Sequence, residues 1–248
     1  MNIAADLHIH STLSPCSSLE MSPAAIIRRA RELGLDVIAV TDHNSMANCF
    51  QAAAIGARSG LAVLFGMEAQ TREDVHILCL FQEQTQAERF NERIYALLPD
   101  VKNNPEFFGD QVVVDAQDNI VRHEDRLLLN ALDISIPDLL ELVRLHDGVG
   151  IPAHVEAPPY GLLVNLGLVP AELADAVLEI SCAARAEGVR QAYPGLARHP
   201  LISSSDAHYL QDIGKAQTIF TATSAALPAL MAAARRGSFQ VRYPEPHG

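Results

Sequence analysis

The chain opens with MNIAADLHIHST (residues 1–12), a stretch in which apolar and polar residues alternate. Apolar side chains occupy the odd positions of residues 3–9, which predicts a strand with one buried face. Asp6, His8 and His10 then share the opposite face. Two imidazoles at this spacing can bind one metal ion, although ordinary polar strand residues show the same pattern. The rest of the chain therefore decides whether this strand begins a metal centre.

Other side chains with metal-binding groups recur at or near the ends of later apolar runs. These runs are residues 37–40, 62–65, 74–80, 149–152 and 201–205. The potential ligands associated with them are Asp42, His43, Glu68, His76, His154, Asp206 and His208. Barrel-type α/β enzymes build their sites at the C-terminal ends of parallel strands, with helices between the strands. We therefore expect these side chains to converge.

The composition is that of an ordinary globular protein of 248 residues, 49% hydrophobic and 19% charged. Strand and helix patterns alternate along this length, which predicts an α/β fold in a single domain covering residues 1–248. Residues 99–123 break the alternation, and we expect a small inserted loop and hairpin there, near the mouth of the site.

The formal net charge is −12, which gives no reason to expect binding to a nucleic-acid polymer. No apolar run approaches the length that spans a bilayer, and the start of the chain lacks a signal-peptide pattern. The four cysteines form no Cys-x-x-Cys pair. We therefore expect a cytoplasmic protein with reduced thiols and no membrane partner, whose oligomeric state stays open.

Five segments resemble, in order, the motifs of the PHP (polymerase and histidinol phosphatase) family. They are Asp6-Leu-His8-Ile-His10-Ser11, Thr41-Asp42-His43-Asn44, Gly66-Met-Glu68, His154 and Ser205-Asp206-Ala-His208. The resemblance runs through nearly the whole chain and is specific as a set. It implies a distorted (β/α)7 barrel, similar to a TIM barrel with one strand fewer, and a metal cluster at the C-terminal mouth of the strands.

The resemblance also implies which residues bind the metals. His8, His10, Glu68 and Asp206 would form the first site, Glu68, His76 and His154 the second, and His43 and His208 part of a third. The family usually has an Asp or His for the third metal where this chain has Pro15 and Cys16. Cys16 and Glu20 are the candidate replacements, so either two or three divalent ions are expected. Histidine and carboxylate ligands suit Zn, Mn or Fe.

Such a cluster predicts a phosphatase, and the small size of the chain favours a small phosphate monoester as its substrate, such as a nucleotide or a sugar or amino-alcohol phosphate. The resemblance implies that Glu68 would bridge two ions, and two such ions would supply a hydroxide able to attack phosphorus. Asp206 or His208 would relay a proton to the leaving oxygen. Beyond the metals, Arg185 is expected to bind the substrate phosphate. The expected partner is accordingly a small phosphorylated substrate.

Two carboxylates next to ligand histidines are expected to support the metal centre. Asp6 and Asp42 would each accept an imidazole N–H and hold the ring in one tautomer, although backbone amides are an alternative partner.

Two other functions remain possible for such a chain. Amidohydrolase barrels use similar His and Asp clusters for C–N hydrolysis, although no motif lysine for carbamylation is apparent here. PHP domains also occur as accessory modules of DNA polymerases, where a non-catalytic metal-binding role is possible. Product analysis separates these functions, since a phosphatase releases inorganic phosphate, a C–N hydrolase releases ammonia and a non-catalytic module releases neither.

Overall fold

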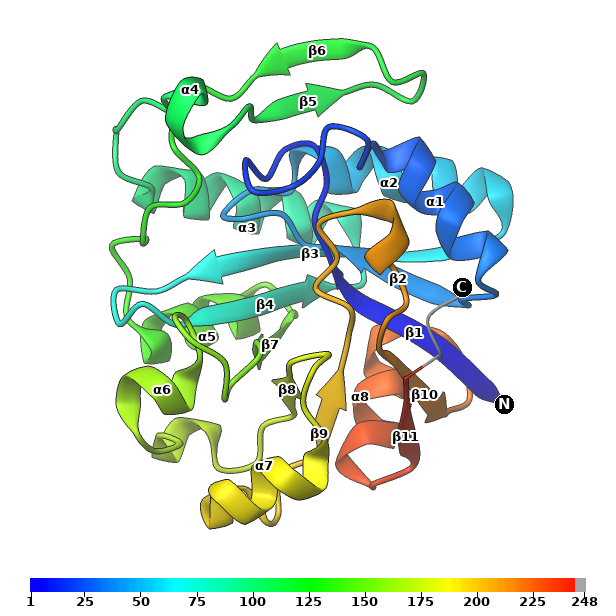
Figure 1. Ribbon diagram of the computed structural model, residues 1–248, viewed down its shortest axis with the longest axis vertical. Coiled ribbons are helices and arrows are strands. Elements are labelled where there is room, and N and C mark those ends of the chain that lie inside the picture. The colour runs from blue at the N-terminus through cyan, green and yellow to red at the C-terminus, as the bar shows by residue number, and fades with distance from the viewer. Residues whose placement is uncertain (244–248) are drawn as a thin grey trace.

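The computed structural model describes residues 1–243, whose strands form one large curled sheet with helices packed outside it (Figure 1). In spatial order its strands are β11 (Phe239–Arg242), β10 (Gln217–Thr221), β1 (Asn2–Ile9), β2 (Val37–Val40), β3 (Ala62–Gln70), β4 (His76–Phe81) and β7 (Val149–Pro152). A parallel pair, β8 (Leu178–Ile180) and β9 (Leu201–Ser203), continues the curl beyond β7. The predicted α/β barrel-type fold is confirmed.

Short backbone hydrogen bonds join the β8–β9 pair to the large sheet on both sides. On one side the amide of Val155, just after β7, donates to the Glu179 carbonyl of β8 at 2.9 Å. On the other side the amide of His10 donates to the Ala207 carbonyl, just after β9, at 2.9 Å. The end of β1 therefore meets the segment after β9, while its beginning pairs with β10.

Strand β4 runs antiparallel to both of its neighbours, β3 and β7. Only residues 71–75 connect β3 to β4, which is too short for a crossover helix and forces the chain back along the same edge. His76 therefore stands at the beginning of its strand and not near the end. Because the strand is reversed, this beginning lies at the same mouth as the ends of β1, β2 and β3.

Helices α1 (Pro23–Glu32), α2 (Ala47–Ser59) and α3 (Gln84–Leu97) lie together on one side of the sheet (Figure 1). The other main helices are α5 (Ile136–Leu145) and α8 (Leu227–Arg235), with shorter pieces at α6 (Leu162–Leu166) and α7 (Ala186–Ala192). The side chain of Ser22 accepts a hydrogen bond from the Ala25 amide, and Pro23 follows as the first helical residue, so α1 starts where its capping residues predict. No helix among the described residues is both long and apolar enough to cross a membrane.

A hairpin stands apart from the large sheet and covers α1 and α2 at the top of Figure 1. It consists of α4 (Pro105–Phe108), β5 (Val112–Val114) and β6 (Ile120–His123), within the segment expected to be inserted. The side-chain amide of Asn48 in α2 donates to the Val112 carbonyl at 2.9 Å, and the Val114 amide donates back to Asn48 at 3.1 Å. This exchange holds β5 against the body of the protein.

Candidate metal centre

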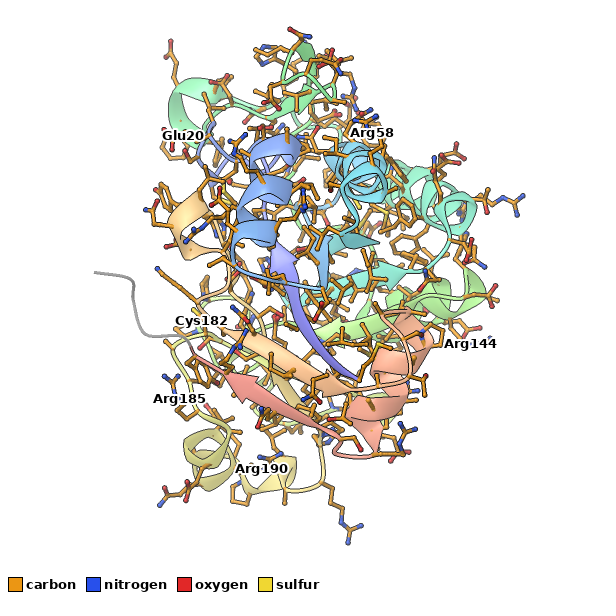
Figure 2. The ribbon with its side chains drawn as sticks, turned by 90° about the vertical axis from the view of Figure 1, so that its right-hand side faces the viewer. Glu20, Arg58, Arg144, Cys182, Arg185 and Arg190 are labelled. Carbon is orange, nitrogen blue, oxygen red and sulfur yellow. The ribbon has the colours of Figure 1, made fainter. Side chains whose placement is uncertain are left out.

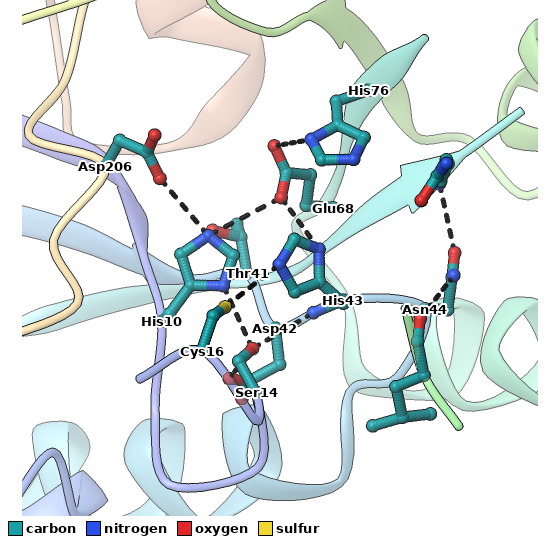
Figure 3. A network of polar contacts seen from close by, with 12 residues as sticks. His10, Ser14, Cys16, Thr41, Asp42, His43, Asn44, Glu68, His76 and Asp206 are labelled. Carbon is teal, nitrogen blue, oxygen red and sulfur yellow. Dashed lines mark hydrogen bonds and ion pairs between the residues drawn. The ribbon is translucent and has the colours of Figure 1, made fainter. Parts of the chain in front are cut away.

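The carboxylate of Glu68, near the end of β3, lies at the centre of a group of imidazoles (Figure 3). Its Oε1 lies 2.9 Å from His76 Nδ1, 3.1 Å from His154 Nε2 and 3.2 Å from His8 Nε2. Its Oε2 lies 3.0 Å from His43 Nδ1 and 3.5 Å from His10 Nε2. Glu68 is only 1% exposed, so one buried carboxylate is shared among histidines from separate strands.

Asp206 adds a second carboxylate to this cluster. Its Oδ1 lies 3.3 Å from the Nε2 atoms of both His8 and His10. The backbone of Asp206 has φ 52°, and that of His154 has φ 31°, conformations that L-residues rarely adopt. Strained residues of this kind gather at functional sites, where the surrounding structure holds side chains in a required direction. The fold therefore brings together the residues predicted to bind the first two metals.

The charges of the cluster move the pKa values of its members in opposite directions. Burial would raise the pKa of Glu68, but the adjacent His76 and His8 outweigh it and hold that pKa well below its usual range. Burial and the neighbouring His208 lower the pKa of His10 well below its usual range. The carboxylate is thus kept ionised and this imidazole neutral, which are the forms that bind metal ions.

The ring nitrogens and carboxylate oxygens of the cluster are arranged as ligands for divalent metal ions. Both ring nitrogens of His76 are buried without a hydrogen-bond partner among the described residues, since its contact with Glu68 is short but poorly aligned. Two groups, His8 with His10 and Glu68, and His43 with Glu68 and His76, have ligand atoms within 4.8 Å of one another. Nitrogen and oxygen ligands so arranged suit Zn, Mn or Fe, and a metal would satisfy the polar atoms that the protein leaves unpaired.

Glu179 is a residue of this centre that was missed in the sequence. It lies buried in β8, and its Oε2 is 2.9 Å from Nδ1 of His8. This contact directs Nε2 of His8 toward Glu68 and fixes the tautomer in which Nε2 is free to bind a metal. The signal available in the sequence was a single glutamate within the apolar run at residues 176–180.

We expect Glu179→Gln to weaken metal binding or activity by about 10–100-fold without unfolding the chain, because the carboxylate that orients His8 is lost. Metal titration followed by isothermal calorimetry measures this change. Glu172→Gln is a matched control, since Glu172 is an exposed glutamate. Equal metal affinity of the two variants would show that Glu179 does not support the centre.

The two aspartates predicted to orient histidines have different partners. Asp42 acts through Ser14, whose hydroxyl donates to Asp42 Oδ1 at 2.7 Å and lies 2.9 Å from His10 Nδ1 (Figure 3). Asp6 instead accepts backbone hydrogen bonds from Ser205 at 3.0 Å and Gly214 at 2.9 Å. The expected contact of Asp6 with an imidazole is therefore replaced by a tie between β1 and the loops after β9.

Of the two candidate ligands for a third metal, the structure brings only Cys16 to the cluster. Its sulfur lies 3.3 Å from His43 Nε2, and its ligand atom and those of His10, His43 and His208 all lie within 4.8 Å of one another. Burial would raise the pKa of the Cys16 thiol, but His208 and His43 lower it to about 7. Glu20 is exposed at the edge of the molecule (Figure 2), and it belongs to none of the groups of potential metal ligands among the described residues.

Arg185, predicted to bind the substrate phosphate, lies outside the pocket. Its guanidinium stacks on the ring of Tyr243 at 3.5 Å and donates to the Ala184 carbonyl at 2.7 Å. It lies on the flank of the molecule in Figure 2 and is not among the pocket-lining residues. Its position just before α7 was visible in the sequence, but the direction of its side chain was not.

A pocket of about 350 Å³ opens onto the cluster. Cys16, His43, Glu68, His76, His154, Asp206 and His208 form its polar side, and Leu129, Pro158, Pro159 and Tyr160 form much of the rest. The ring of Tyr160 stacks on His76 with centroids 4.2 Å apart and 15° between the planes. The pocket therefore joins a polar floor of potential metal ligands to an apolar wall, so a ligand could meet the metal centre on one side and pack against the wall on the other.

The sequence matches two family models, the PHP domain over residues 6–135 and a PHP-associated segment over residues 197–239. Over 69 residues it is 35% identical to the PolC-type DNA polymerase III of Oceanobacillus iheyensis, a match covering 28% of this chain and 5% of the polymerase.

Solved structures share the fold over nearly the whole chain. The lesion-specific endonuclease Q of Pyrococcus furiosus matches with a TM-score of 0.72 and 18% identity, over 97% of this chain and 58% of that chain. Endonuclease Q in complex with a 27-mer duplex bearing an abasic lesion matches with a TM-score of 0.71 and 18% identity, over 98% and 58%. A protein assigned as a metal-dependent phosphoesterase from Bifidobacterium adolescentis matches with a TM-score of 0.57 and 18% identity, over 94% of both chains. This chain thus spans about three fifths of endonuclease Q.

These matches correct the prediction about partners. We expected a small phosphorylated substrate and no binding of a nucleic-acid polymer, because the net charge is −12. That expectation is wrong, because the same fold occurs in an endonuclease whose structure holds a DNA duplex with the lesion at its active site. The net charge is an average over the whole surface, whereas bound divalent ions would determine the electrostatic potential at the site itself.

Proposed function

This chain belongs to the PHP domain family of metal-dependent phosphoesterases, and we propose that it hydrolyses phosphodiester bonds of nucleic acid at the centre around Glu68. The observation that carries the proposal is the buried Glu68 carboxylate within 3.5 Å of five imidazoles at the floor of an open pocket. Because the chain spans only part of endonuclease Q, that enzyme supplies a class of substrate to test and no more.

The residues of the centre divide into two overlapping sets that share Glu68. His8, His10 and Asp206 would hold one ion with Glu68, and His76 and His154 would hold a second. Ions so placed would polarise the phosphoryl oxygens and lower the pKa of water. Ser14 and Glu179 keep the imidazoles of His10 and His8 aimed at this position.

Asp206 is the better placed of the two predicted proton carriers. Its side chain is 36% exposed and lines the pocket, so one carboxylate oxygen can face the substrate while the other contacts His8 and His10. His208 is the less available of the two, since its Nδ1 lies 2.9 Å from the Asp206 carbonyl and it belongs to the group of potential metal ligands around Cys16. We assign to Asp206 the acceptance of the proton from the attacking water and its relay to the leaving oxygen.

The size of the pocket limits how nucleic acid reaches the centre. A volume of about 350 Å³ matches one nucleotide better than a base-paired segment. The substrates to expect are therefore a strand end, a single strand or an extruded nucleotide. Tyr160 and Pro159 would form the wall against which a base or sugar packs.

A panel of end-labelled oligonucleotides, with Mn²⁺ or Zn²⁺ supplied, tests the proposal. It includes a single strand, an intact duplex and a duplex with an abasic site, beside a set of phosphate monoesters and amides. Metal-dependent cleavage of any oligonucleotide supports the proposal. If inorganic phosphate from the monoesters is the only product, the proposal is wrong and the monoester prediction from the sequence replaces it. Release of ammonia would instead indicate C–N hydrolysis.

A further inference from the structure

Cys16 differs from the other three cysteines in its surroundings. Cys49 and Cys79 are buried among apolar residues, and within residues 1–243 Cys182 belongs to none of the clusters of potential metal ligands. Cys16 is exposed and directs its sulfur at His43 Nε2 from 3.3 Å. A tetrahedral zinc ion bound by sulfur and nitrogen separates these two atoms by roughly 3.6 Å, so the observed spacing is close to that of a shared metal.

The two histidines beside Cys16 each have one nitrogen occupied, which leaves the other free for a ligand. His43 contacts Glu68 Oε2 through Nδ1 at 3.0 Å and presents Nε2 to the sulfur. His208 contacts the backbone carbonyl of Asp206 through Nδ1 at 2.9 Å. A carbonyl accepts a hydrogen bond only from a protonated nitrogen, so in the neutral ring of His208, the form that binds a metal ion, Nε2 carries the lone pair.

The loop that carries Cys16 is tied directly to His208. The Ser18 amide donates to the His208 carbonyl at 2.9 Å, and the Ser17 hydroxyl donates to the same oxygen at 3.2 Å. These two hydrogen bonds to the backbone of His208 therefore hold the loop, and with it the Cys16 sulfur, close to His208. Three ligands held in this way meet the requirement for a preorganised metal site.

We propose that Cys16, His43 and His208 form a thiolate-containing metal site beside the Glu68 cluster, and that this site selects zinc over manganese. Metal binding releases the thiol proton to solvent and forms one sulfur–metal bond. Thiolate is a soft ligand that favours Zn²⁺, whereas Mn²⁺ prefers carboxylate and water. Three protein ligands leave a fourth tetrahedral position for substrate or water. The inference extends the proposed function, because it names a metal of the same centre.

Cobalt substitution tests the site without any measurement of turnover. The full chain is stripped of metal and titrated with Co²⁺, and the near-ultraviolet charge-transfer band of a sulfur–cobalt bond is recorded. We expect the band in the unaltered protein and in Cys182→Ser, and its loss together with one equivalent of bound metal in Cys16→Ser. Cys16→Asp should keep the third equivalent, lose the band and bind Mn²⁺ more tightly relative to Zn²⁺.

Two results would overturn the proposal. One is a fully cobalt-loaded protein without the band, and the other is a band that persists in Cys16→Ser. If Cys16→Ser does not fold, a second experiment on the unaltered protein decides the question. The protein is treated with an alkylating reagent with and without Zn²⁺, and mass spectrometry shows whether Zn²⁺ protects the Cys16 thiol. A chain that shows the band but cleaves no nucleic acid would contradict only the proposed function.

Discussion

Glu68→Gln is expected to lower kcat of the metal-loaded protein by at least about 10²–10³-fold while the chain still folds. The substitution keeps the shape of the side chain but removes the negative charge shared by the imidazoles of His8, His43, His76 and His154. In the variant, the side-chain amide nitrogen of Gln would face histidine ring nitrogens that in the unaltered protein face a carboxylate oxygen of Glu68. Steady-state kinetics, metal analysis and circular dichroism measure activity, metal content and folding.

Glu20→Gln is the control for this variant. Glu20 is exposed (Figure 2) and belongs to none of the groups of potential metal ligands among the described residues, so its loss should change neither metal content nor kcat. A Glu68→Gln protein with full metal content and unchanged kcat would remove Glu68 from the reaction. A Glu20→Gln protein that loses one metal equivalent would restore Glu20 as a ligand in place of Cys16.

The convergence of the ligands was predictable because strand geometry repeats so regularly. Residues two apart on a strand share a face, so His8 and His10 had to point the same way. Ends of neighbouring strands lie at one mouth, so His43, Glu68 and Asp206 had to approach them. These rules depend only on the local pattern and the strand order, and the observed curled sheet obeys them.

The supporting residues were harder to predict because they depend on distances across the fold. Glu179 contacts His8 from 171 positions away in the sequence. Asp6 lies on the same strand face as His8 but about 6.6 Å further back, at the rise of a strand. There it meets the amides of Ser205 and Gly214 instead of an imidazole. The position of Asp6 two residues before His8 therefore indicated the correct face of the strand but the wrong hydrogen-bond partner.

Gly109→Ala is expected to lower the free energy of unfolding by about 2–6 kcal/mol, or to displace the loop that carries Cys16. Gly109 has φ 99° and ψ 170°, a conformation essentially restricted to glycine. A Cβ atom there would lie 2.3 Å from the carbonyl oxygen of Pro15, the residue before Cys16. Urea denaturation with metal analysis measures both consequences, because a displaced loop costs the Cys16 site its metal.

Gly167→Ala separates the backbone cost from the clash. Gly167 also has a positive φ, at 72°, but no atom lies within 4 Å of the position that its Cβ would take. The free energy of unfolding of Gly167→Ala should therefore fall only by the cost of a left-handed residue, about 1–2 kcal/mol. The variant should keep its full metal content. Equal losses in the two variants would mean that the contact of Gly109 with Pro15 contributes nothing. A larger loss in Gly109→Ala, with less bound metal, would show that the hairpin segment positions the Cys16 loop.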